Sequence, residues 1–192
     1  HALHSLPTRT ASGPRAMWNE CFPPRDHPPA RGFFGKRNLS TERLAGLCRV
    51  IPRDYELPKW AIYKDDDSGR YDWLMSGHRL IFPLYDSQGK GRSFKARGML
   101  DGKIKNVNPL GYSTAGLCFA CNNGQEMLST GKHFDAVLFA EGEVDFLSAV
   151  ELRQDADTAV FGIYSGGWSN DHAARLNCDE WHYLTDVDDP GD

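Results

Sequence analysis

The fold is decided by the stretch Ala136-Val137-Leu138-Phe139-Ala140-Glu141-Gly142, in which a continuous apolar run ends in an acidic residue and a glycine. Such a run is typical of a strand that is buried on both faces of a parallel sheet. Apolar spacing then predicts the elements that follow, which are a helix at 144–154, a strand at 158–164, a short helix at 170–176 and a strand at 181–185. This alternation of strands and helices predicts a doubly wound α/β unit with parallel pairing.

Upstream of this unit, the pattern indicates antiparallel strands. Apolar residues at 79–85 predict a first strand, and Pro83 within it implies an edge position or a bulge. A second strand is predicted at 93–100, and Asp101-Gly102 predicts a hairpin turn into a third strand at 103–105. The sequence therefore predicts a small basic α+β subdomain that contains an antiparallel β-meander.

The first 70 residues are rich in proline and arginine, and they predict a segment with short helices at 16–21 and 41–47. The prolines at 7, 14, 23, 24, 28 and 29 predict that much of the first thirty residues is extended or turned. Within it, the run Gly32-Phe33-Phe34-Gly35-Lys36-Arg37 mixes aromatic and basic residues. Two interpretations stay open, because the phenylalanines could dock on a neighbouring core or the run could contact nucleic acid. The basic β-rich subdomain is predicted to follow at 71–132, and the α/β unit at 133–192.

Charge is distributed unevenly along the chain, whose formal net charge is −4. Residues 1–132 carry 20 Lys and Arg against 12 Asp and Glu, whereas residues 133–192 carry 2 against 14. The basic part suits a polyanion such as nucleic acid, and the acidic part suits divalent cations if its carboxylates converge. The alternative is that both parts are ordinary solvated surface. No apolar run reaches the roughly 20 residues of a membrane helix, so no membrane partner is expected.

Four carboxylates are candidate metal ligands, because they follow predicted strands at the edge where open parallel sheets bind ligands. Glu141 ends the first strand, and Asp145 lies four residues later at the start of the helix. Asp186 and Asp188 follow the last strand, and their spacing places both side chains on one side of an extended segment. Carboxylates this close repel each other unless a cation lies between them, and Mg²⁺ prefers such oxygen ligands. The sequence therefore predicts a divalent-metal site.

The two acidic stretches resemble the signature motifs of Toprim domains. They are Ala140-Glu141-Gly142-Glu143-Val144-Asp145-Phe146-Leu147-Ser148 and Leu184-Thr185-Asp186-Val187-Asp188-Asp189-Pro190-Gly191. The resemblance is strongest to the primase half of phage and mitochondrial primase–helicases, and next to bacterial replicative primases. Residues 79–98 with Asp101-Gly102-Lys103 resemble the basic subdomain that precedes Toprim in those primases. The resemblance implies a Toprim-type parallel sheet with flanking helices, truncated at its C-terminus because the Toprim fold continues past the second acidic motif.

The same resemblance implies the catalytic core of a DNA primase, from a phage or mobile element, that makes short primers on single-stranded DNA from nucleoside triphosphates. Glu141 and Asp145 would be the catalytic carboxylates. One or two Mg²⁺ or Mn²⁺ ions would be held by Glu141, Asp186 and Asp188. The template backbone or the nucleotide phosphates would be held by Arg79, Lys95, Arg97, Lys103 and Lys105. A replicative helicase, in cis or in trans, would be a partner, and the location would be cytoplasmic, at the nucleoid or replication fork.

Two alternative functions stay open. A Toprim nuclease would use the same carboxylates to cleave phosphodiesters, and a non-catalytic module would use the fold only to bind DNA or to assemble. The basic meander favours the primase, and the retention of all four carboxylates favours an enzyme.

The chain contains five cysteines, an odd number that favours a reducing compartment over a disulfide framework. Cys118-x-x-Cys121 is half of a zinc site, but the sequence offers no second pair with suitable spacing. We therefore expect no structural zinc and predict that these two cysteines lie in a loop.

Overall fold

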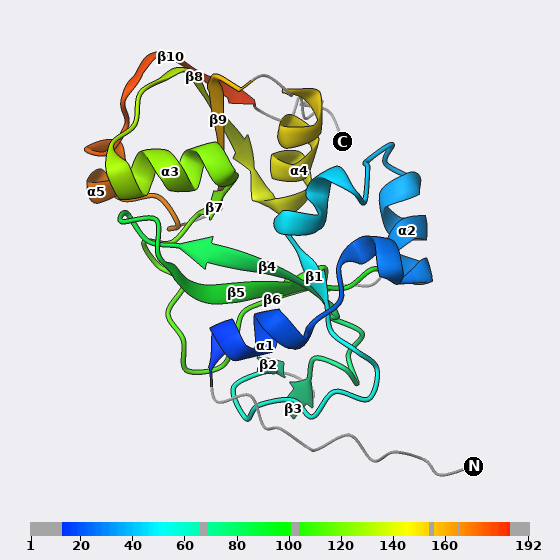
Figure 1. The fold of residues 1–192 in the computed structure, drawn as a ribbon. Helices are drawn as coiled ribbons and strands as arrows, with labels where there is room; N and C mark the ends of the chain where they lie inside the picture. Colours follow the sequence, from blue (N-terminus) through cyan, green and yellow to red (C-terminus); the bar gives the residue numbers. More distant parts are fainter. Residues whose placement is uncertain (1–12, 66–68, 101–103, 154–155, 165, 185–192) are drawn as a thin grey trace, which may run out of the picture.

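The protein is described here by a computed structural model, which covers residues 13–65, 69–100, 104–153, 156–164 and 166–184. Two four-stranded sheets form its framework (Figure 1). One is antiparallel with strand order β1-β4-β5-β6, and the other is mixed with strand order β10-β8-β9-β7. β2 (Ile62–Asp65) and β3 (Gly69–Asp72) form a separate antiparallel pair. Within these ranges, no helix is long and apolar enough to cross a membrane.

The antiparallel sheet contains the predicted meander. Its strands are β1 (Arg49–Val50), β4 (Leu80–Tyr85), β5 (Gly91–Arg97) and β6 (Asn106–Val107). The third strand of the meander begins at Asn106 rather than at 103, and the predicted turn Asp101-Gly102 lies outside the described residues. Pro83 lies in β4 beyond the two residues that pair with β1, and the β4–β5 register shifts one residue later, between Leu84 and Tyr85. Pro83 therefore lies where β4 no longer pairs with β1 and next to an irregularity in its pairing with β5, which is the kind of position at which a sheet tolerates proline.

The mixed sheet is built by the predicted α/β unit, and this fold class is confirmed. Its elements are β8 (Phe134–Glu141), α4 (Gly142–Leu152), β9 (Thr158–Ile163), α5 (Asn170–Ala173) and β10 (Cys178–Leu184). β8 pairs in parallel with both β9 and β10. β7 (Phe119–Ala120) adds to β9 in the antiparallel direction, and α3 (Asn122–Thr130) follows it directly.

In its described residues, the N-terminal segment forms the short helices α1 (Pro14–Glu20), η1 (Pro24–Asp26), α2 (Pro28–Gly35) and η2 (Arg43–Gly46). The sequence predicts helices near α1 and η2, but the prolines at 28 and 29 favour extended chain where α2 lies. That expectation is wrong, because proline is preorganised for the first turn of a helix, where its missing N–H breaks no hydrogen bond. His27 caps α2, since its Nδ1 accepts a hydrogen bond from Ala30 N at 3.2 Å.

The core lies in layers around the two sheets. Both sheets share one cluster with the buried face of α4, where Phe119 stacks on Phe146 and meets Phe82 edge to face, with ring centroids 5.8 and 5.9 Å apart. α3 covers the other face of the mixed sheet, and α1 covers the outer face of the antiparallel sheet (Figure 1). β10 forms one edge of the mixed sheet, and Trp181 on this strand is 63% exposed. This layering fixes α4, and with it the first acidic motif, against both sheets.

Candidate functional site

The carboxyl end of β8 carries the first candidate residue, Glu141, whose side chain is exposed. Gly142 follows it with a φ of +74°, in the left-handed region that favours glycine, and turns the chain into α4. In the parallel register, Glu141 lies opposite Ile163 at the end of β9, and Ala140 lies opposite Leu184 at the end of β10. The carboxyl ends of three parallel strands therefore meet beside Glu141, at the edge where open sheets bind ligands.

The other three carboxylates of the predicted site differ in what the structure says of them. Asp145 is half-buried in the first turn of α4, where negative charge is favourable. Asp186 and Asp188 lie outside the described residues, so their approach to Glu141 stays a prediction. Among the residues that are described, no three His, Cys, Asp or Glu side chains gather as metal ligands. The predicted donor set consists of carboxylate oxygens alone, and such a set suits Mg²⁺ or Mn²⁺.

Glu143, which lies between the two carboxylates of the first motif, has a different environment. Its side chain is 3% exposed and forms an ion pair with Arg97 of β5, whose side chain is 14% exposed. The same oxygen, Oε1, accepts a hydrogen bond from Asn106 Nδ2 of β6 at 3.2 Å. Sequence reasoning missed this contact because Arg97 and Asn106 lie 46 and 37 positions away along the chain. The pair joins the first turn of α4 to the antiparallel sheet.

A basic cavity of about 800 Å³ lies beside this ion pair, because Arg97 forms part of its wall. The other wall residues come from α2, from the chain just before β4 and from the chain between β5 and β6. Its basic side chains are His27, Lys36, Arg37, Arg79, Arg97 and Lys105. No acidic side chain of the described residues lines it. A cavity of this volume is large enough for a small ligand, and its positive charge suits phosphate groups.

The predicted basic residues divide into three groups. Those that line the cavity are Arg79, Arg97 and Lys105. Lys95 does not line it, since its Nζ lies 4.4 Å from the ring centroid of Tyr164, just after β9, and burial lowers the pKa of its ammonium group. Lys103 lies outside the described residues. The binding role of all five residues stays a prediction.

The Gly32–Arg37 run, for which docking on a core and contact with nucleic acid were both open, supplies residues of the cavity wall. Phe33 and Phe34 are buried, as expected if they dock on a core, whereas Lys36 and Arg37 line the cavity. The Arg37 guanidinium lies 3.9 Å from the ring centroid of Phe33, and the Arg97 guanidinium lies 5.7 Å from it. Guanidinium groups at such distances are attracted by the ring face. Phe33 thus holds two of the positive groups at the cavity wall.

The cysteine pair flanks β7 rather than lying in a free loop. Cys118 and Tyr85 exchange two backbone hydrogen bonds, of 2.8 and 3.0 Å, which connect β4 to the chain at β7. Cys121 Sγ caps α3, accepting hydrogen bonds from Gly124 N at 3.4 Å and Val160 N at 3.2 Å. Burial raises the pKa of both thiols, which keeps them protonated. Their contacts are therefore those of structural residues.

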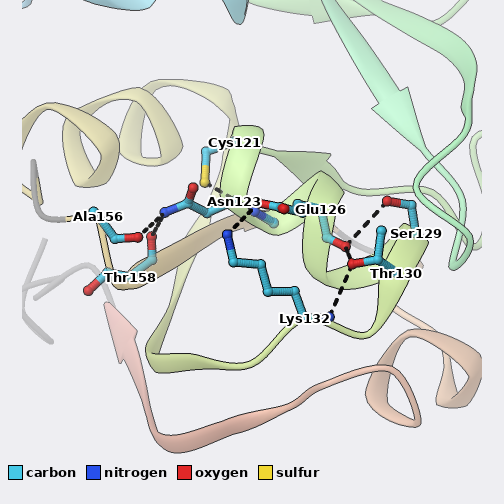
Figure 2. Close-up of polar contacts among 9 residues, drawn as sticks. Cys121, Asn123, Glu126, Ser129, Thr130, Lys132, Ala156 and Thr158 are labelled. Carbon is cyan, nitrogen blue, oxygen red and sulfur yellow. Dashed lines mark hydrogen bonds and ion pairs between the residues drawn. The ribbon is translucent and has the colours of Figure 1, made fainter.

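Figure 2 shows the side chain that completes the attachment of α3 to β9. Asn123 Nδ2 donates hydrogen bonds to the backbone oxygens of Ala156, at 3.0 Å, and Thr158, at 2.9 Å. At the other end of α3, Lys132 Nζ lies 3.0 Å from Glu126 Oε2 in an exposed ion pair, a kind of contact that contributes little to stability. These side-chain hydrogen bonds of Asn123 fasten the amino end of α3 to the chain at β9.

Comparisons with known proteins agree with this architecture. No protein-family model matches the chain. The DNA primase of Pasteurella multocida (strain Pm70) is 24% identical over 151 residues, which cover 71% of this chain and 26% of the relative. The chain thus spans about a quarter of the length of this curated relative.

Solved structures of bacterial primases share the fold. The DnaG primase catalytic domain bound to single-stranded DNA has a TM-score of 0.55 at 17% identity, over 81% of this chain and 55% of that chain. The Aquifex aeolicus primase, with its zinc-binding and RNA polymerase domains, has a TM-score of 0.56 at 15% identity, over 87% and 45%. The RNA polymerase domain of Mycobacterium tuberculosis DnaG, in complex with a double-stranded DNA with a 6-nucleotide overhang, has a TM-score of 0.52 at 21% identity, over 84% and 57%. The chain is therefore similar in sequence to a DNA primase and has the fold of the DnaG catalytic core.

Proposed function

We propose that this chain is the catalytic core of a primase that makes short primers on single-stranded DNA from nucleoside triphosphates, with Mg²⁺ or Mn²⁺. The observation that carries the proposal is the contact between the acidic motif and the basic cavity. Glu143, two residues after Glu141, pairs with Arg97 in the cavity wall. The contact brings the first acidic motif next to a basic cavity that would hold phosphates, and this neighbourhood supports a role in phosphoryl transfer.

The acidic edge has the residues for the chemical step. Glu141, Asp186 and Asp188 would hold the metal, which would supply charge neutralisation at the phosphate and alignment of the reacting oxygens. Glu141 is exposed at a strand end, so its carboxylate is free to assist loss of the proton from the attacking 3′-hydroxyl. Asp145, one helical turn into α4, would support the same edge.

The basic cavity would hold the template backbone or the nucleotide phosphates. Arg79, Arg97 and Lys105 line it, as do Lys36 and Arg37. Contacts of this kind are electrostatic, sensitive to salt and largely indifferent to base sequence. Two of the similar structures are primase domains in complex with DNA, which supports a DNA template for this chain. A helicase partner, in cis or in trans, remains part of the proposal.

Primer synthesis is the experiment that tests the proposal. The purified protein is incubated with Mn²⁺ or Mg²⁺, nucleoside triphosphates and a single-stranded template, and products are resolved by length. We expect short oligonucleotides, and we expect Glu141→Gln to abolish them. The matched control is Asp135→Asn, because Asp135 is exposed at the opposite end of the same strand. Unchanged product from the Glu141 variant would remove the assignment.

The same assay separates the alternatives. Metal-dependent loss of end-labelled DNA, without oligonucleotide synthesis and abolished by Glu141→Gln, would identify a nuclease. DNA binding with neither synthesis nor cleavage, and with no shift of the melting temperature on adding Mn²⁺, would identify a non-catalytic module.

A further inference from the structure

The buried ion pair has a geometry that separates Glu143 from its two acidic neighbours. Side chains two positions apart on a helix point about 200° apart around its axis, whereas side chains four apart share a face. Within α4, Asp145 therefore points away from Glu143, which faces β5 and β6. Oε1 of Glu143 is occupied there by two donors, Arg97 and Asn106. Glu143 is thus placed to bind a cation and an amide of the protein rather than a metal.

The two donors are themselves fixed relative to each other. Arg97 and Asn106 are paired residues in the β5–β6 register, so they come from adjacent strands at one level of the sheet. The Glu143 carboxylate on α4 therefore contacts both β5 and β6, at the end of β5 where Arg97 and the residues after it form the cavity wall. Arg97 is also in contact range of Phe33 of α2, with 5.7 Å between its guanidinium and the ring centroid. Glu143 and Phe33 together define where the Arg97 charge lies.

We propose that Glu143 is a positioning residue that holds Arg97 at the cavity wall, compensates its charge, and sets the first turn of α4 relative to the bound phosphates. The proposal rests on the proposed function, since it names the residue that couples the acidic edge to the basic cavity. A guanidinium that loses its one carboxylate partner among the described residues is left with an uncompensated charge, and it then attracts other anions. Removing the Glu143 charge therefore leaves the whole Arg97 charge to nucleic-acid phosphates, while the position of Arg97 becomes less well defined.

The test uses the purified protein and the variant Glu143→Gln, which retains the shape of the side chain. We expect a lower melting temperature and a roughly 10- to 100-fold loss of primer synthesis, carried by kcat because the phosphates are misplaced rather than unbound. We also expect the plot of log affinity against log salt for single-stranded DNA to become steeper by up to about 0.7, because the Arg97 charge is no longer compensated by Glu143 and acts fully on the phosphates. A purely structural role would not change that slope. The matched control is Glu151→Gln on the same helix, which removes the ion pair with Arg43, outside the cavity lining.

A double variant distinguishes the positioning role from a purely structural contact between α4 and the antiparallel sheet. In Glu143→Gln combined with Arg97→Gln, no buried charge is left uncompensated, so the melting temperature should recover part of the loss seen in Glu143→Gln alone. Primer synthesis should stay low, because the cavity has lost the Arg97 charge. If primer synthesis recovers together with the melting temperature, the Glu143–Arg97 ion pair has only a structural role and the proposal is overturned. An unchanged salt slope in Glu143→Gln would overturn it as well.

The two proposals fail in different ways. If the unaltered protein makes no primers, the proposed function fails, while the salt slope and the melting temperatures still report on the Glu143–Arg97 pair. If it does make primers and Glu143→Gln is indistinguishable in synthesis and in salt slope, the positioning role fails and the proposed function stands.

Discussion

Gly162 is the position at which the packing of α4 on the mixed sheet can be tested most sharply. It lies in β9, opposite Ala140 of β8 and Phe119 of β7. A methyl group added there would lie 2.7 Å from Phe146 Cβ and 2.8 Å from Phe119 Cδ2. Carbon atoms pack at about 3.5–4.0 Å, so roughly 1 Å of movement is required. Phe146 Cβ is next to the helix backbone and cannot swing aside, so α4 itself must shift.

We therefore expect Gly162→Ala to destabilise the protein by about 1–3 kcal/mol, the usual cost of overpacking a core. For a chain of this size, the melting temperature should fall by roughly 2–12 °C. Primer synthesis should fall as well, because α4 begins directly after Glu141. Scanning calorimetry or fluorescence-detected melting measures the shift.

The control is Gly46→Ala, because a methyl group at Gly46 in η2 meets no atom within 4 Å. Its effect should stay within about 1 kcal/mol, the range of alanine substitutions that cause no strain. If Gly162→Ala melts within 1 °C of the unaltered protein, the close packing of α4 on β9 described here is incorrect.

Two further predictions concern the cavity and the pH dependence of stability. Lys105→Gln should make the plot of log affinity against log salt for single-stranded DNA shallower by about 0.7. Arg175→Gln, outside the cavity lining, should leave this slope unchanged. Equal slopes for the two variants would exclude the cavity as the DNA site. His172 Nδ1 lies 2.8 Å from Ser169 Oγ, and burial lowers the pKa of this histidine below its usual 6.5. The contribution of neutral His172 to stability is therefore complete above about pH 6.5 and is lost as the pH falls from there towards the folded-state pKa. Chemical unfolding at pH 7 and pH 5 should show that loss, at most about 1.4 kcal/mol per pH unit, and a His172→Gln variant with the same pH profile would refute it.

The α/β unit was predictable because β8 and β9 are largely apolar runs that end at punctuating residues, whereas β10 is exposed and begins at Cys178, three residues before the predicted start at 181. Residues 136–140 form the centre of β8, and the acidic residue and glycine after them mark where the strand ends and the helix begins. The meander was predictable for a similar reason, except that its third strand begins at Asn106. Local sequence carried the signal in each of these cases.

The remaining features depend on contacts that local sequence does not encode. α2 was missed because two consecutive prolines favour extended chain unless they occupy the first turn of a helix. β7 is only two residues long, and it is a strand because it pairs with β9. Glu143 could not be distinguished from Glu141 by composition, because its partner Arg97 lies in another layer of the fold. The cavity likewise joins α2 to the end of β5, which are distant in sequence.

The most direct test of the account is a crystal structure of the protein grown with Mn²⁺, in which anomalous scattering locates the ion. We predict an Mn²⁺ peak bonded to the carboxylates of Glu141 and of at least one of Asp186 and Asp188. An Mn²⁺ ion bound elsewhere, or a Glu141 carboxylate turned away from Asp186 and Asp188, would contradict the metal site on which the proposed primer synthesis depends.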